Sequence, residues 1–191
     1  MRMILHQDIG TQQYIIKKYA LITTIFCFLV FGCQETGPST SFVKIEANHT
    51  KLIDGIDSYQ SIKDFEQFLR KASLQWEVTG DKGSSQSGNK PPFHIYEITI
   101  KNYSHLGFLG ELHISFFNDR LIDTTFYPVD IDRYKEALEK KEGIQFDNQQ
   151  KAKIPPFTEI YTASDHKNHR YVKWEDTRLA NEFDLWIKKY S

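Results

Sequence analysis

Cysteine is scarce in this chain, and both cysteines lie near its start. Cys27 and Cys33 are the two cysteines among 191 residues. Cys27 lies inside an apolar run, which makes it a poor disulfide partner for Cys33. Residues 34–191 therefore contain no disulfide framework, and the hydrophobic core must hold the folded region together.

The sequence also lacks a hydrophobic run long enough for a typical membrane-spanning helix. The main apolar stretch is residues 19–32, fourteen residues without a charge, whereas a spanning helix needs about 20. Lys17 and Lys18 limit it on one side, and Gln34 and Glu35 follow on the other. A basic start, a short apolar core and a small residue at the exit are typical of a secretory signal.

The sequence also lacks an excess of charge of either sign. The chain has 24 Lys and Arg against 25 Asp and Glu, for a formal net charge of −1. No basic block is present, and a nucleic-acid partner would require one. A nucleic-acid partner is therefore not expected. Aromatic residues, by contrast, make up 14% of the chain, which is enough to build a dense core.

The residues that end the apolar stretch are Val30-Phe31-Gly32-Cys33. They resemble the lipobox of bacterial lipoproteins, in which a branched aliphatic residue, a free position and a small residue precede an obligatory cysteine. Phe31 departs from the Ala or Ser that is usual there. The resemblance implies a diacylglyceryl group on the Cys33 thiol, cleavage before Cys33 and acylation, for example with palmitate, of the new amino group. The alternative is an uncleaved short anchor.

This resemblance predicts three segments. Residues 1–32 are a lipoprotein signal peptide, residues 33–41 are the lipidated cysteine and a flexible tether, and residues 42–191 are a single globular domain. Gln34 is not the Asp that retains lipoproteins at the inner membrane of enteric bacteria. The expected location is therefore the cell envelope, anchored in a lipid bilayer, with the outer membrane favoured where the organism has one.

The pattern of residues 42–191 predicts an α+β fold, with a mainly antiparallel sheet of about five to six strands and three helices. Ser61 with Asp64, and Asp130 with Gly143, mark the ends of two of the helices. Asn118-Asp119 is a compact hairpin signal. The expected helices cover residues 62–72, 130–143 and 177–190, and the expected strands cover 74–79, 93–101, 108–117, 120–128, 157–163 and 170–176.

One local group could suggest a metal site. Asp165, His166 and His169 lie in the stretch DHKNH, but zinc needs three or four converging ligands. One of His94, His105 and His113 would have to complete the shell, and nothing in the sequence places them there. A solvated hairpin turn is the favoured interpretation, and no metal or other cofactor is predicted apart from the lipid on Cys33.

The sequence also contains no recognisable catalytic motif. The loop 83–88, GSSQSG, has its glycines one residue too far apart for a nucleophile elbow, and a strand follows it. Asp123 is the one acid in an apolar-rich strand, and is more often a solvent-facing residue than a catalyst. Trp76, Trp174 and Asp123 are the candidate partner-binding residues, with core packing as the alternative for the two tryptophans.

These observations favour a non-catalytic protein-binding module in the envelope, such as an assembly factor, an inhibitor or an immunity-type protein. The expected partner is another envelope protein. The alternative is a small enzyme or small-ligand binder that gathers groups such as His94, His113 and Asp123 from separate strands. A purely structural envelope protein is a third interpretation.

Overall fold

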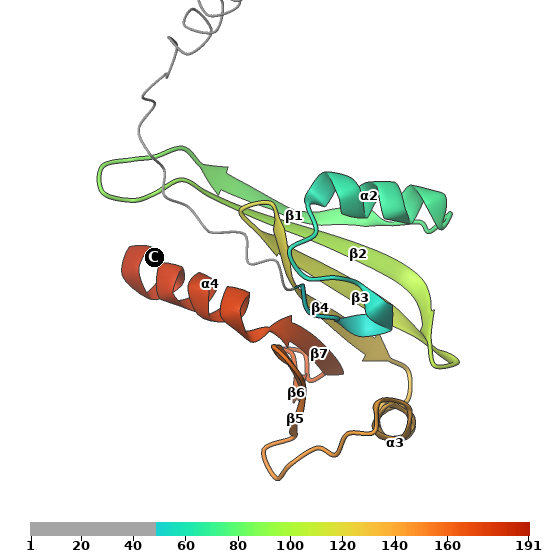
Figure 1. The fold of residues 1–191 in the computed structure, drawn as a ribbon. Coiled ribbons are helices and arrows are strands. Elements are labelled where there is room, and N and C mark those ends of the chain that lie inside the picture. Colours follow the sequence, from blue (N-terminus) through green and yellow to red (C-terminus); the bar gives the residue numbers. More distant parts are fainter. Residues whose placement is uncertain (1–48) are drawn as a thin grey trace, which may run out of the picture. The chain divides into compact units, whose positions relative to one another are not determined.

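A computed structural model describes residues 49–191, which form three α-helices and one seven-stranded antiparallel sheet (Figure 1). The predicted signal peptide, Cys33 and the tether lie outside the described residues. The elements in chain order are η1 (Ile53–Gly55), α2 (Ile62–Lys71), β1 (Glu77–Ser84), β2 (Phe93–His105), β3 (Phe108–Phe117), β4 (Arg120–Pro128), α3 (Ile131–Glu142), β5 (Lys151–Ile154), β6 (Thr158–Ser164), β7 (Arg170–Asp176) and α4 (Thr177–Tyr190).

The α+β class and the three helices are confirmed, but the expected number of strands was too low. The missed strand is β5, which has only four residues, two of them lysines. Strand β1 also differs, because it begins at Glu77 and runs to Ser84 rather than covering 74–79. Leu74 instead donates its backbone N–H to the Leu69 carbonyl at the end of α2. Short, polar edge strands carry little of the alternation from which strands are predicted.

The helix boundaries follow the capping signals. The Ser61 side chain accepts a hydrogen bond from the backbone N–H of Asp64, and Asp130 accepts one from that of Arg133. Gly143 ends α3 in the left-handed conformation with φ +66°, which costs a glycine little. Local chemistry therefore sets where α2 and α3 begin, and where α3 ends.

The strand order β1-β2-β3-β4-β7-β6-β5 is the feature that builds the site. Strands β1 to β4 form a meander, and the chain then crosses through α3 before the hairpins β5–β6 and β6–β7 return. As a result β7 pairs with β4, with Asp123 opposite Glu175 and Thr125 opposite Lys173. Side chains some fifty positions apart in sequence thus become neighbours on one face of the sheet.

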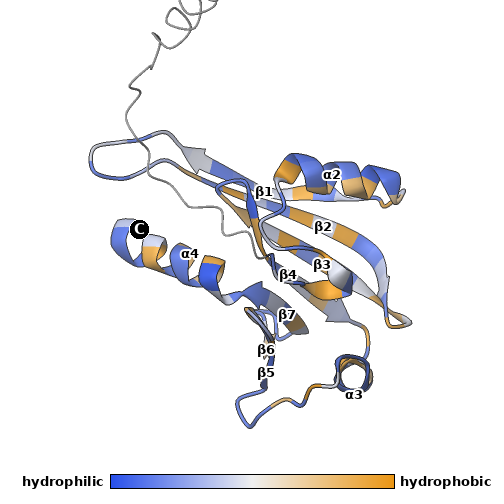
Figure 2. Ribbon diagram, viewed as in Figure 1, coloured by the Kyte–Doolittle hydropathy of each residue, from blue (hydrophilic) through white to orange (hydrophobic). Residues whose placement is uncertain are grey.

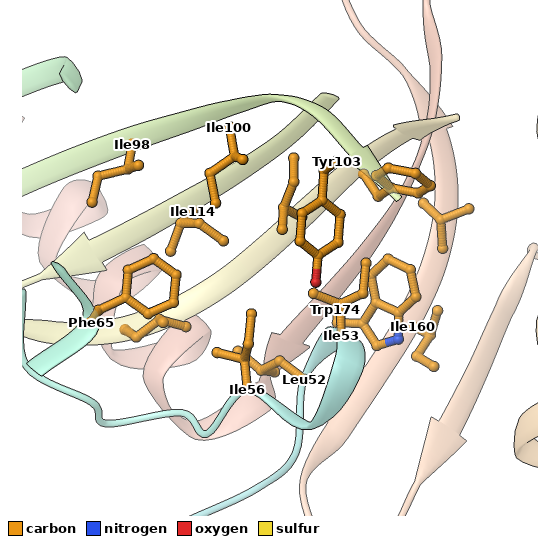
Figure 3. Packing of buried hydrophobic residues seen from close by; sticks show 14 of the residues in the cluster. Leu52, Ile53, Ile56, Phe65, Ile98, Ile100, Tyr103, Ile114, Ile160 and Trp174 are labelled. Atoms are coloured by element: carbon orange, nitrogen blue, oxygen red, sulfur yellow. The ribbon is translucent and has the colours of Figure 1, made fainter. Parts of the chain in front are cut away.

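One face of the sheet, which we call the apolar face, carries the main core. Helix α2 contributes Phe65 and Leu69 to it, and α3 contributes Tyr134 and Leu138. Figure 3 shows part of this packing, and Figure 2 shows apolar residues recurring along the central strands. The sheet residues in this core include Ile98, Ile100, Leu112, Ile114, Phe126, Ile160, Val172 and Trp174.

The opposite face is covered over part of its area by α4. Phe117, Ile122 and Leu179 form a second, smaller core there, with Phe183 and Trp186 packed against it. Ile122 reaches this core because the pairing of β3 with β4 shifts by one residue after Ser115. Among residues 49–191, no helix is long and apolar enough to cross a membrane.

Candidate functional site

The part of the sheet that α4 leaves uncovered carries polar side chains, and we call it the polar face. Its members are neighbours because side chains that alternate along a strand point to the same side of a sheet. The strand pairings place the following residues on it: Glu97, Thr99, Glu111, His113, Ser115, Asp123, Thr125, Tyr127, Glu159, Tyr161, Tyr171, Lys173 and Glu175.

A hollow of about 360 Å³ lies on this face. Strands β3, β4 and β7 supply most of its lining, and the β6–β7 turn closes one side with Asp165 and His166. Glu97 of β2 also lines the hollow. A Cβ atom on Gly80, its pairing partner in β1, would clash with the Glu97 carboxylate. Glycine at position 80 therefore allows Glu97 to occupy this part of the face.

A cluster of opposite charges lies at the hollow, whose lining includes Asp123 and Lys173. The Lys173 ammonium is 3.0 Å from Asp123 Oδ2 and 3.7 Å from Glu175 Oε2. Burial lowers the pKa of Lys173, but the charges of Asp123 and Glu175 and the hydrogen bond to Asp123 outweigh it, so the pKa is raised overall. Lys173 is therefore held as a cation, which makes it unsuited to act as an amine nucleophile or a base.

Burial shifts the pKa values of two further groups of this region upward. Burial raises the pKa of Glu175, although Lys173 acts in the opposite direction. The Tyr161 hydroxyl donates a long hydrogen bond of 3.4 Å to Glu175, and burial raises the pKa of Tyr161 to about 12. The hydroxyl of Tyr161 is accordingly a permanent donor at neutral pH.

Three rings cross the polar face next to the cluster. The ring centroids of His113 and Tyr127 are 4.9 Å apart, and those of Tyr127 and Tyr171 are 5.3 Å apart. Glu111 orients the His113 ring through its Nε2 atom. Half-buried aromatic rings that keep one side accessible are suited to contact a partner or a ligand.

The β6–β7 turn explains the sequence DHKNH without a metal. Asp165 accepts hydrogen bonds from the backbone N–H groups of Lys167 and His169, and lies 3.4 Å from the His169 ring. Burial acts to raise the pKa of Asp165, but these backbone bonds and the nearby imidazoles lower it overall. Within the described residues no three His, Cys, Asp or Glu side chains are placed to hold a metal ion.

The other histidines that the sequence offered as ligands are separated by the fold. His113 lines the same hollow as His166. His105 instead lies on the apolar side, where its Nδ1 is 2.6 Å from the Tyr134 hydroxyl, and burial lowers its pKa. His94 pairs with Asp81 of β1 at 2.8 Å. The polar face thus collects His113 and Asp123 but not His94.

The candidate partner-binding residues fall in different environments. Trp174 is 2% exposed and lies in the main core, so a partner could reach it only by opening that core. Trp76 is half-buried against the core, with the Arg70 guanidinium 5.7 Å above its ring. Asp123 is buried too, and it is fixed by its contact with Lys173.

Sequence reasoning missed Tyr127, Tyr171 and Lys173. Each alternates with apolar neighbours in its strand, so its direction was predictable from the strand pattern. The pairing of β4 with β7, which brings the three together, has no local signal. A scan against protein-family models and a search of curated proteins found no match for this chain.

Proposed function

We propose that this protein is a lipid-anchored component of the bacterial cell envelope that binds a partner protein through its polar face. Cys33 would carry the lipid, and the outer membrane is the proposed location where the organism has one. The observation that carries the proposal is the uncovered polar face itself, because α4 shields only its neighbouring apolar part.

The composition of the polar face supports a binding role. Tyrosine is enriched at protein interfaces, where it combines a large apolar area with a hydroxyl. Tyr127 and Tyr171 lie side by side here, and the hydroxyls of Ser115 and Thr125 line the same hollow. A shallow, preformed surface of this kind needs little rearrangement to bind, which lowers the entropic cost of association.

The charge cluster supports binding rather than catalysis. Lys173 is compensated by two carboxylates, so it serves to fix the surface and to set its charge. Buried ion pairs are often kept for such specificity rather than for stability. The partner proposed is another envelope protein, and the activity would be that of an assembly factor, an inhibitor or an immunity-type protein.

Photocrosslinking in intact cells tests the proposed face. Benzoylphenylalanine at Tyr171, on the polar face, should capture one envelope protein in stoichiometric yield. The matched control is the same group at Phe68, an aromatic residue of α2 that is 42% exposed. Equal capture from both positions, or none from position 171 across several growth conditions, would contradict the proposal.

The anchor is tested separately by the intact mass of the protein extracted from membranes. We expect a chain that starts at Cys33 and carries diacylglyceryl and acyl groups. The Cys33→Ala variant should keep its full N-terminal segment and gain no lipid. A mature chain that starts at any other residue would refute the lipid anchor while leaving the binding face open to test.

A second candidate function is a small envelope enzyme or a binder of small polar molecules. The observation in its favour is that the hollow brings Asp123 and His113 together from different strands, next to Glu175 with its raised pKa. A thermal-shift screen of small polar compounds would support this alternative if a hit lost its effect in His113→Ala and Tyr127→Ala variants. Hits that are insensitive to both substitutions would count against it.

A further inference from the structure

A cluster of exposed apolar side chains lies outside the polar face. It is formed by the turn between β2 and β3 and by the end of β4. Leu109 is 58% exposed and Val129 is 89% exposed. The two are neighbours, since the Val129 backbone N–H donates a 3.1 Å hydrogen bond to the Leu109 carbonyl. Leu106 and Phe108 complete the cluster, which we call the apolar tip, and both also rest partly on the core.

The backbone conformation of the β2–β3 turn is energetically unfavourable for Leu106. Leu106 and Gly107 have φ values of +52° and +79°, and the β3–β4 turn repeats this left-handed geometry with Asn118 and Asp119 at +50° and +60°. Asn and Asp tolerate this conformation, whereas it costs a leucine roughly 1 kcal/mol or more. The apolar tip therefore keeps a leucine where the β3–β4 turn uses polar residues.

We propose that the apolar tip contacts the lipid bilayer to which the protein is anchored. This inference rests on the lipid anchor at Cys33 proposed above. Fifteen residues, 34–48, separate that cysteine from the described residues, and such a chain reaches at most about 55 Å. The longest strand has thirteen residues and so is about 44 Å long, which leaves the apolar tip within reach of the membrane surface.

The shape and size of the apolar tip favour a bilayer over a protein partner. A stable protein interface buries about 800 Å² on each side and involves about 20 to 30 residues, whereas the apolar tip is a narrow hairpin turn at one end of the sheet (Figure 1). Lipid needs no complementary shape. Arg133, which borders the apolar tip, can extend its guanidinium to the phosphates of the headgroups.

The energy required is small because the anchor already holds the domain near the membrane. Insertion of four side chains would be a weak interaction for a free protein, but a tether converts it into an intramolecular event at high effective concentration. The consequence is a preferred orientation. The apolar tip would point toward lipid, and the domain would present the same surfaces to the aqueous compartment in every copy.

Site-directed spin labelling of the lipidated protein on phosphatidylethanolamine–phosphatidylglycerol vesicles tests the proposal. A nitroxide at Val129→Cys should become several-fold less accessible to a water-soluble nickel complex and more accessible to oxygen. Labels at Leu185→Cys and Val78→Cys, exposed aliphatic positions on α4 and β1, should keep their accessibility. Adding Leu109→Ser should restore nickel access at position 129.

The outcomes separate the two proposals. Equal nickel access at positions 129 and 185 on vesicles that retain the protein would overturn the membrane contact and leave the anchor intact. Failure of all labelled variants to sediment with the vesicles would instead refute the anchor, and the apolar tip proposal with it.

Discussion

The two faces of the sheet are built by the same strands and do different work. Ile114 and Ser115 are consecutive in β3, yet Ile114 is 0% exposed in the main core while Ser115 lines the hollow of the polar face. The apolar face is closed by α2, α3 and a dense set of aliphatic and aromatic side chains. The polar face is left uncovered by α4, and paired charges such as Lys173 and Asp123 fix its side chains. Consecutive residues of one strand thus serve the stabilising core on one side of the sheet and the proposed binding face on the other.

The sharpest test of this separation compares those two neighbours. Ile114→Ala should lower the free energy of unfolding by about 2–5 kcal/mol, because it opens a cavity in a fully buried site. Ser115→Ala should change it by less than about 0.5 kcal/mol. Urea denaturation followed by circular dichroism measures both. Similar losses would show that the polar face belongs to the core.

Removing one partner of the charge cluster is expected to cost more stability than any other change on the polar face, because it leaves a buried charge poorly compensated. Asp123→Ala leaves Lys173 with one carboxylate in a mostly buried place, and we expect a loss of about 3 kcal/mol. The control is Asp132→Ala, which breaks the exposed pair with Arg170 and should cost far less, because water screens an exposed ion pair. If the two losses were equal, burial of the cluster would not matter.

A smaller, pH-dependent effect is expected at the start of α4. Burial acts to raise the pKa of Asp176, but hydrogen bonds from Arg178 and Ser58 lower it overall. A lowered pKa means that the stabilisation is present above the unfolded value, near 4, and is lost as the pH falls through the folded value.

Asp176→Asn should therefore cost about 2 kcal/mol at pH 7 and little at pH 2. Thermal melts of both proteins between pH 2 and pH 7 measure the difference. A constant gap over that whole range would show that the ionised carboxylate is not the stabilising form.

The smallest effect on stability is expected at Glu97, which is exposed and whose carboxylate makes no hydrogen bond or ion pair within residues 49–191. Glu97→Gln should change the unfolding free energy by less than about 0.5 kcal/mol. The same change should reduce partner capture from the polar face several-fold, if this carboxylate contributes to recognition. Glu136→Gln, on the exposed side of α3, is the matched control and should leave capture unchanged.

Much of the fold was predictable because its signals are local. The caps at Ser61 and Asp130 and the hairpin at Asn118-Asp119 each depend on a few adjacent residues, and all three are confirmed. Strand β5 was missed because its four residues carry no clear alternation. The candidate site was predicted only in fragments: the alternative interpretation grouped Asp123 and His113 with His94, whereas the fold pairs His94 with Asp81.

The sequence by itself determined the α+β class, the three helices and the alternation that gives the central strands a buried and a polar side. These follow from side-chain periodicity and capping, which act over a few residues. Only the tertiary structure decided that β7 lies beside β4, that Lys173 contacts Asp123, and that α4 covers the neighbouring apolar part of this side of the sheet and leaves the polar face open. Such pairings depend on how separate segments bury their apolar sides together, and no short stretch of sequence contains that information.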